Sequence, residues 1–186
     1  MIEVIGPKDK NFDLSGKQYF NVTSHSTDFC KELSPFFLGP CKLYRNFQSK
    51  NMENAWQYSK VYKKHLDENN EPSLEYFKWA YYGWNSEYAH RYPMGKGSIP
   101  EYSFWNGEHL DYIEARKEIY IPLYSECARK TDAFQKLKKL NDDGIDLVLW
   151  DFDGRSTKES MDEIINNPYK KCGHGFVIKM MLLGMI

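Results

Sequence analysis

The chain has 186 residues, which is most simply one domain (1–186) that buries about two-thirds of its unfolded surface. Its formal net charge of −1 excludes a broadly basic nucleic-acid-binding surface but leaves room for a local basic groove. Aromatic residues make up 16 % of the chain, and they can serve as core side chains or as stacking surfaces for bases and sugars.

Cysteine usage and the chain ends indicate where the protein works. The four cysteines form no Cys-x-x-Cys pair, so we expect no zinc site, and their wide spacing fits reduced thiols in a reducing cytoplasm. The N-terminus has no charged leader followed by an apolar core, so we expect no signal peptide. The apolar run 176–186 is too short to cross a bilayer, and we therefore expect a cytoplasmic protein with no membrane partner.

The first third of the chain alternates short strands with polar loops. Residues 1–18 are expected to form a strand (Ile2–Ile5) and an N-terminal arm, followed by a second strand at 19–23. Two prolines and a glycine frame residues 32–40, which are therefore a loop, and a short strand follows at 42–44.

Residues 52–62 have the apolar periodicity of a helix, which Ser49 or Asn51 can cap. On this helix Glu53, Gln57 and Lys60 fall within an arc of about 60°, opposite the apolar stripe. One interpretation is a solvated face of the ordinary kind. The alternative is a compact set of carboxylate, amide and ammonium that binds a ligand.

Glu53, Trp56, Gln57 and Lys60 resemble, in register, the signature helix of the NADAR family. Ser34-Pro35-Phe36 is similar to the Ser-Asn-Phe loop that precedes that helix in the family, with Pro35 in place of the asparagine. The resemblance implies cleavage of N-glycosidic bonds of ribose, including removal of ADP-ribose from guanine bases. It also implies that Ser34 and Phe36 contact the ligand.

The middle of the chain, 66–110, is expected to be rich in insertions. Ser73 can cap a helix over 74–83, and residues 84–90 are expected to continue as a short helical piece. The stretch 91–97 contains Gly-x-Gly with a neighbouring arginine and lysine. It is either a surface turn with solvated basic side chains or a loop that binds phosphate through backbone N–H groups and positive charge. It resembles an Arg-Met-Gly-Arg-like stretch of the NADAR family, which implies that Arg91 and Lys96 contact a pyrophosphate.

Two helices are expected after a loop at 100–107. The first covers 111–125, where Pro122 can introduce a kink, and the second covers 132–140 with Thr131 as its cap. Asn141-Asp142-Asp143-Gly144 is a strong turn signal.

Residues 145–150 give the clearest strand of the sequence, and Asp151 and Asp153 follow directly at its end. Three interpretations remain open: an aspartate-rich turn, a divalent cation held by the two carboxylates, and a counterpart of an Asp with a Trp-Gly turn in the NADAR family. The sequence also resembles the Asp-x-Asp-Gly nucleophile motif of haloacid-dehalogenase-type phosphatases. We reject that interpretation because those enzymes need a long parallel sheet after the motif, and only 32 residues follow Gly154.

The closing segment contains a short helical turn at 162–166 and the run 170–175, which leads into the last apolar element. Gly175 lies where the NADAR family has the glycine of its closing turn, which implies close approach to the ligand. His174 is either an acid–base group or a structural histidine.

These observations predict a mainly helical α+β domain with a small sheet, similar to the NADAR fold. The resemblance to the NADAR family implies an N-glycosidase that cleaves a ribose–base bond, acting on an ADP-ribose-like or nucleotide ligand or on ADP-ribosylated nucleic acid. Glu53, followed by Asp151 or Asp153, is expected to stabilise the developing positive charge, and Gln57 to orient the ribose. Lys60 is expected to assist the leaving group, bind a phosphate or form an imine, while Trp56 or Trp150 stacks on the base. The alternative is a binding protein for such a ligand without turnover.

Overall fold

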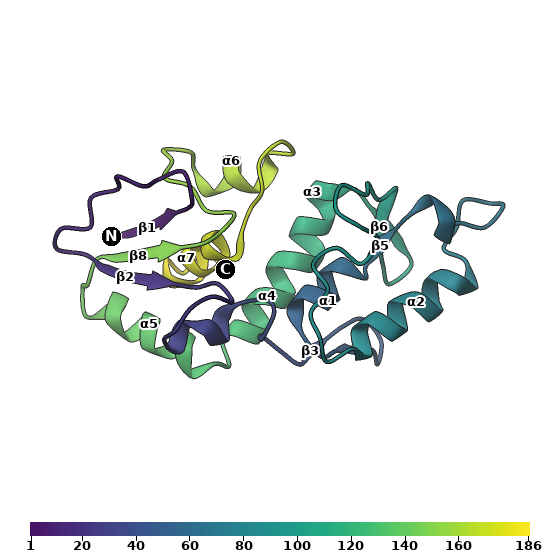
Figure 1. Cartoon of the computed structure of the whole chain (residues 1–186), viewed down its shortest axis with the longest axis horizontal. Coiled ribbons are helices and arrows are strands. Elements are labelled where there is room, and N and C mark those ends of the chain that lie inside the picture. The colour runs from purple at the N-terminus through teal and green to yellow at the C-terminus, as the bar shows by residue number, and fades with distance from the viewer. The chain divides into compact units, whose positions relative to one another are not determined.

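The computed structural model describes residues 1–186, which form an α+β arrangement of short helices and three small sheets (Figure 1). The α+β class is therefore confirmed, although three small sheets replace the single one that we expected. The chain divides into two compact units, Met1–Phe37 with Tyr124–Ile186 (unit 1) and Leu38–Leu123 (unit 2). Unit 2 is thus inserted into the sequence of unit 1. That both fold together as one domain stays a prediction.

Unit 1 is built on a three-stranded parallel sheet with the strand order β1-β8-β2. Strand β8 (Leu147–Trp150) is central, and it pairs with β1 (Ile2–Ile5) on one side and β2 (Gln18–Asn21) on the other. Leu147, Val148 and Leu149 are fully buried, as expected for a central parallel strand that is covered on both faces. All three strands carry their carboxyl ends to the same edge, where Asp151 follows β8.

The helices of unit 1 are set by recognisable caps. The 3-10 helix η1 (Phe29–Leu33) is capped by Asp28, helix α5 (Asp132–Asp142) by Thr131, and helix α6 (Met161–Asn166) by Ser160. The closing helix α7 (His174–Leu182) is almost wholly buried and lies against β1 and α5. Helix α4 (Ile121–Ala128) contains the boundary between the two units.

Unit 2 contains two antiparallel sheets and five helical segments besides the start of α4. Strands β3 (Cys41–Lys42) and β4 (Gln48–Ser49) form a hairpin, and β5 (Lys60–Val61), β6 (Tyr102–Trp105) and β7 (Glu108–Leu110) form a sheet in that order. The helical segments between and after them are α1 (Met52–Gln57), η2 (Lys63–His65), α2 (Leu74–Asn85), α3 (Tyr112–Ala115) and the π-helical η3 (Arg116–Tyr120).

The sequence predictions for residues 86–90 and 100–107 of unit 2 are wrong. The predicted loop 100–107 contains strand β6, which turns into β7 through Asn106 and Gly107, both with positive φ. Asn-Gly is the preferred two-residue turn of a hairpin, so the signal was in the sequence. Residues 86–90, expected to be helical, are irregular because helix α2 ends at Asn85.

Candidate functional site

Helix α1, which carries most of the predicted site, is shorter than the sequence pattern predicted. Asn51 caps it by accepting a hydrogen bond from the backbone N–H of Asn54, and the helix ends at Gln57. Lys60 therefore lies on strand β5 rather than on the helix, which corrects the prediction of one helix for all three polar residues. The chain leaves the helix because β5 pairs with β6 and because the Tyr76 hydroxyl donates to the freed carbonyl oxygens of Tyr58 and Ser59.

Glu53, Gln57 and Lys60 nevertheless form one connected chain of polar groups. The Gln57 side-chain amide donates to Glu53 Oε1 at 2.9 Å, and Lys60 Nζ donates to Gln57 Oε1 at 2.8 Å. Glu53 is 8 % exposed and Gln57 is 9 % exposed, so the interpretation as a solvated face is wrong for these two. Burying a carboxylate costs free energy unless hydrogen bonds compensate it, and such costs are concentrated at functional sites.

Aromatic rings line this polar chain on one side. Lys60 Nζ lies 4.9 Å from the centroid of the Trp56 ring, and the Trp56 ring contacts Tyr120 at a centroid distance of 5.3 Å and Tyr112 at 6.5 Å. The guanidinium of Arg116 lies 4.6 Å from the Tyr112 ring. The arrangement joins a carboxylate, an amide and two cations to an aromatic wall, a combination suited to an anionic ligand with a planar base.

Our reasoning from the sequence missed Arg116, Tyr112 and Tyr120. Arg116 is 2 % exposed and lies in the π-helical segment η3, which precedes Pro122. Because Pro122 has no backbone N–H, a regular hydrogen bond is missing there, and π-helical turns often occur at functional sites. The available signal was an arginine three and four residues before Ile119 and Tyr120, in register with the covered side of a helix, where a solvated cation does not belong.

Asn54, fully buried on α1, fixes the segment that leads to Arg91. Its side-chain amide donates to the carbonyl oxygen of Tyr88 at 2.8 Å and to that of Ser86 at 3.4 Å, and its Oδ1 accepts from the backbone N–H of His90 at 2.8 Å. Three backbone groups of one irregular segment thus depend on one side chain. The segment is held against the helix that carries Glu53.

Tyr58 adds a second attachment of this segment to the end of α1. The Tyr58 hydroxyl lies 2.6 Å from His90 Nδ1, and burial raises the pKa of Tyr58 to about 12. Beyond the segment, the Arg91 guanidinium lies over the Tyr92 ring at 5.5 Å, and Lys96 is exposed. That Arg91 and Lys96 contact a pyrophosphate stays a prediction.

In unit 1, Asp151 is a buried anchor at the carboxyl edge of the sheet. It is 2 % exposed, and its Oδ2 accepts a hydrogen bond from the backbone N–H of Gly175 at 2.9 Å, in the first turn of α7. His174 Nδ1 lies 3.4 Å from the same oxygen, and His174 Nε2 lies 2.7 Å from the carbonyl oxygen of Val22. Both ring nitrogens of His174 therefore face protein groups, which favours its structural interpretation.

Glycines make this close packing around Asp151 possible. A Cβ atom on Gly173 would lie 2.2 Å from Asp151 Oδ2, and one on Gly175 would lie 3.1 Å from Asp151 Cβ. Asp151 thus takes the place of a side-chain cap at the positive end of helix α7, where a carboxylate is stabilised.

Asp153 lies beside Asp151 but makes different contacts. Its carboxylate pairs with Lys171 at 3.0 Å, while its backbone N–H donates to Asp151 Oδ1. Both oxygens of Asp151 thus accept hydrogen bonds from backbone N–H groups, which supports a structural role more than a cation site. A divalent cation held by the two carboxylates stays a prediction.

The other predicted ligand contacts of unit 1 are distributed around its loops. Trp150, at the end of β8, is half-buried and packs edge-on against Phe152 at 4.9 Å. Ser34 is 1 % exposed, and its hydroxyl oxygen accepts from the backbone N–H of Phe36 at 3.4 Å, which fixes the turn after η1. Phe36 is half-buried.

The structure thus brings some of the predicted residues together in two sets and leaves Ser34, Phe36, Arg91, Lys96 and Trp150 outside them. Trp56 and the three polar residues of α1 and β5 form the set in unit 2, which we call the Glu53 site. Asp151, Asp153 and Gly175 form the set in unit 1.

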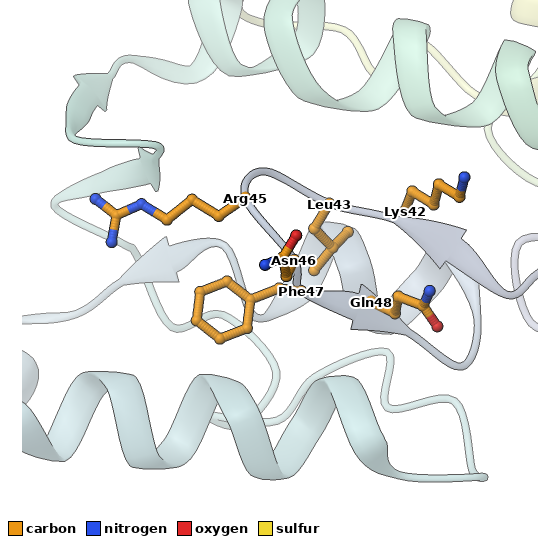
Figure 2. A pocket seen from close by; sticks show the side chains of 6 residues that line it. All are labelled: Lys42, Leu43, Arg45, Asn46, Phe47 and Gln48. Atoms are coloured by element: carbon orange, nitrogen blue, oxygen red, sulfur yellow. The ribbon is translucent and has the colours of Figure 1, made fainter.

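A separate hollow of about 360 Å³ lies over the β3–β4 hairpin of unit 2 (Figure 2). Its lining residues are Lys42, Leu43, Arg45, Asn46, Phe47 and Gln48. The cationic side chains of Lys42 and Arg45 extend in opposite directions, so they do not converge on one ligand group.

None of the helices combines the length and apolar character needed to cross a membrane. All four cysteines are buried and form no disulfide. No family model, no curated protein and no solved structure matches the chain. The resemblance to the NADAR family therefore stays a prediction.

Proposed function

We propose that the Glu53 site binds a nucleotide or an ADP-ribose-like ligand and hydrolyses its ribose–base N-glycosidic bond. The observation that carries this proposal is the hydrogen-bonded chain from Glu53 through Gln57 to Lys60, nine-tenths buried at its acidic end and bordered by the Trp56 ring. The resemblance of these four residues to the NADAR signature helix supports the same reaction.

The chemistry of the bond assigns a role to each group. As the bond between C1′ and the base nitrogen breaks, positive charge develops on C1′, and the Glu53 carboxylate stabilises it. The oxygen of a water molecule then bonds to C1′, and the water's proton is lost while the departing base gains one. Gln57 orients the ribose, Lys60 donates to the leaving base or binds a phosphate, and Trp56 stacks on the base.

The direct test is incubation of the protein with ADP-ribosylated guanosine, followed by chromatography for released ADP-ribose. Glu53→Gln keeps the shape of the side chain but removes its charge, and we expect it to lower the release rate at least about 100-fold. Glu75→Gln, at an exposed glutamate of α2, is the matched control and should release ADP-ribose at the wild-type rate.

Stability measurements separate a catalytic from a structural role of Glu53. We expect the melting temperature of Glu53→Gln to lie within about 2 °C of the wild type. Release of ADP-ribose by Glu53→Gln at the wild-type rate contradicts the assignment of Glu53 as a catalytic residue. Loss of release together with a large fall in melting temperature contradicts it as well. Calorimetric binding of ADP-ribose without any release by the wild type supports the binding protein instead.

A further inference from the structure

Large aromatic side chains are exposed on unit 2 at an unusual density between positions 81 and 92. Tyr81, Tyr82, Tyr88 and Tyr92 are 58 %, 69 %, 80 % and 47 % exposed. Tyrosine is usually intermediate in burial, so four exposed tyrosines within twelve residues single out this segment as a candidate interaction surface.

Several contacts show that this segment is ordered. Asn54 holds the backbone at Tyr88 and His90, and the Tyr58 hydroxyl contacts the His90 ring. Tyr82 lies near enough to Tyr58 to affect its pKa. The tyrosines are therefore presented on a fixed support, which keeps the entropic cost of binding low.

The charges around the tyrosines are those that attract a polyanion. Arg91 lies over the Tyr92 ring, and Lys96 follows in an exposed turn. The acidic residue within the segment, Glu87, is neutralised by an ion pair with Lys50 at 3.0 Å. Aromatic faces interleaved with cations are the combination that binds single-stranded nucleic acid, by stacking on bases and by contacts with phosphates.

We propose that Tyr82, Tyr88, Arg91 and Tyr92 form a binding surface for single-stranded nucleic acid. Bases stack on the tyrosines, while Arg91 and Lys96 neutralise phosphates. Asn54 and Glu53 are neighbours on α1, so this surface is attached directly to the helix of the Glu53 site. The inference rests on the proposed function and extends it, because the ADP-ribosylated base would then belong to a single-stranded nucleic acid. Binding of the nucleic acid itself does not require cleavage.

The test is fluorescence anisotropy of the full chain with a fluorescein-labelled single-stranded oligothymidylate, which has no ADP-ribose to remove. We expect Tyr88→Ala and Tyr92→Ala each to weaken binding about 5- to 150-fold, while Tyr88→Phe stays within about twofold of the wild type. Tyr169→Ala is the matched control, because Tyr169 is 95 % exposed but belongs to unit 1.

Salt dependence tests the phosphate contacts separately. We expect Arg91→Gln to reduce the slope of log affinity against log salt concentration by about 0.7, the value for one phosphate contact on a single strand. The inference is overturned if the wild type does not bind the oligonucleotide at low salt, or if Tyr88→Ala binds as well as Tyr169→Ala. Binding of the oligothymidylate is measured without any cleavage, so a failure of this surface and a failure of the proposed glycosidase activity are distinguishable.

Discussion

The replacement Asn54→Ala tests most sharply how the segment 86–90 is held. It removes two good hydrogen bonds, to the carbonyl oxygen of Tyr88 and from the backbone N–H of His90, and one long bond to Ser86. Each good bond contributes about 1 kcal/mol net, and the partly buried backbone groups left without a partner add roughly 1 kcal/mol. We therefore expect the free energy of unfolding to fall by about 2–3 kcal/mol.

Urea denaturation of the wild type and variant gives this difference directly. Asn85→Ala is the matched control, because Asn85 is an exposed asparagine whose amide donates to the carbonyl oxygen of Tyr81, and its loss should cost no more than about 0.5 kcal/mol. Hydrogen exchange at residues 86–92 should increase in Asn54→Ala and not in Asn85→Ala. Equal stabilities of the two variants would refute the argument that Asn54 fixes the segment.

Two further predictions concern packing and acid stability. Gly83→Ala should destabilise the protein by roughly 1–3 kcal/mol, although alanine favours helices, because its Cβ atom would lie 2.1 Å from the Tyr58 ring; a higher melting temperature than the wild type would contradict this. The hydrogen bond from Lys170 is the main cause that lowers the pKa of Glu159 to about 2. Ionised Glu159 therefore stabilises the folded state fully above about pH 4.5, and this stabilisation is lost as the pH falls toward 2. Glu159→Gln should therefore be less stable than the wild type at pH 7, and melting curves at decreasing pH should show this gap closing; a gap that stays constant between pH 5 and 2 would disagree.

Local signals in the sequence predicted most individual elements. Asn51, Ser73 and Thr131 each cap the helix that follows, as expected of short polar side chains at helix starts. The uninterrupted apolar run before Asp151 is the central strand of a parallel sheet. These features depend on neighbours within about four residues, so the sequence shows them directly.

Features that depend on distant residues could not be predicted in the same way. The partners of β8 precede it by more than 120 residues, and nothing local in the sequence indicates that unit 2 is inserted between β2 and β8. Helix α1 ends earlier than predicted because β5 pairs with Ser103 and Tyr102 of β6. This tertiary pairing outweighs the local helical periodicity of the sequence. Glu53, Gln57 and Lys60 are connected by hydrogen bonds even though Lys60 lies outside the helix.

The roles of the two carboxylate sets differ more than the sequence indicated. Glu53 and Asp151 are both buried acidic residues, Glu53 in the first turn of α1 and Asp151 directly after β8. Asp151 accepts from the backbone N–H groups of Asp153 and Gly175, which explains it as a structural anchor. Glu53 accepts from the side chain of Gln57, which in turn accepts from Lys60, and this connection distinguishes it as the functional candidate.

The most direct measurement of the central claim is a crystal structure of Glu53→Gln grown with ADP-ribose. We predict that the anomeric carbon of the terminal ribose lies within about 3.5 Å of the residue-53 side chain, with Gln57 bonded to a ribose hydroxyl. Lys60 should lie beside the ribose or a phosphate oxygen. Ligand bound elsewhere, with the side chains at 53, 57 and 60 unchanged and distant from it, would contradict the account.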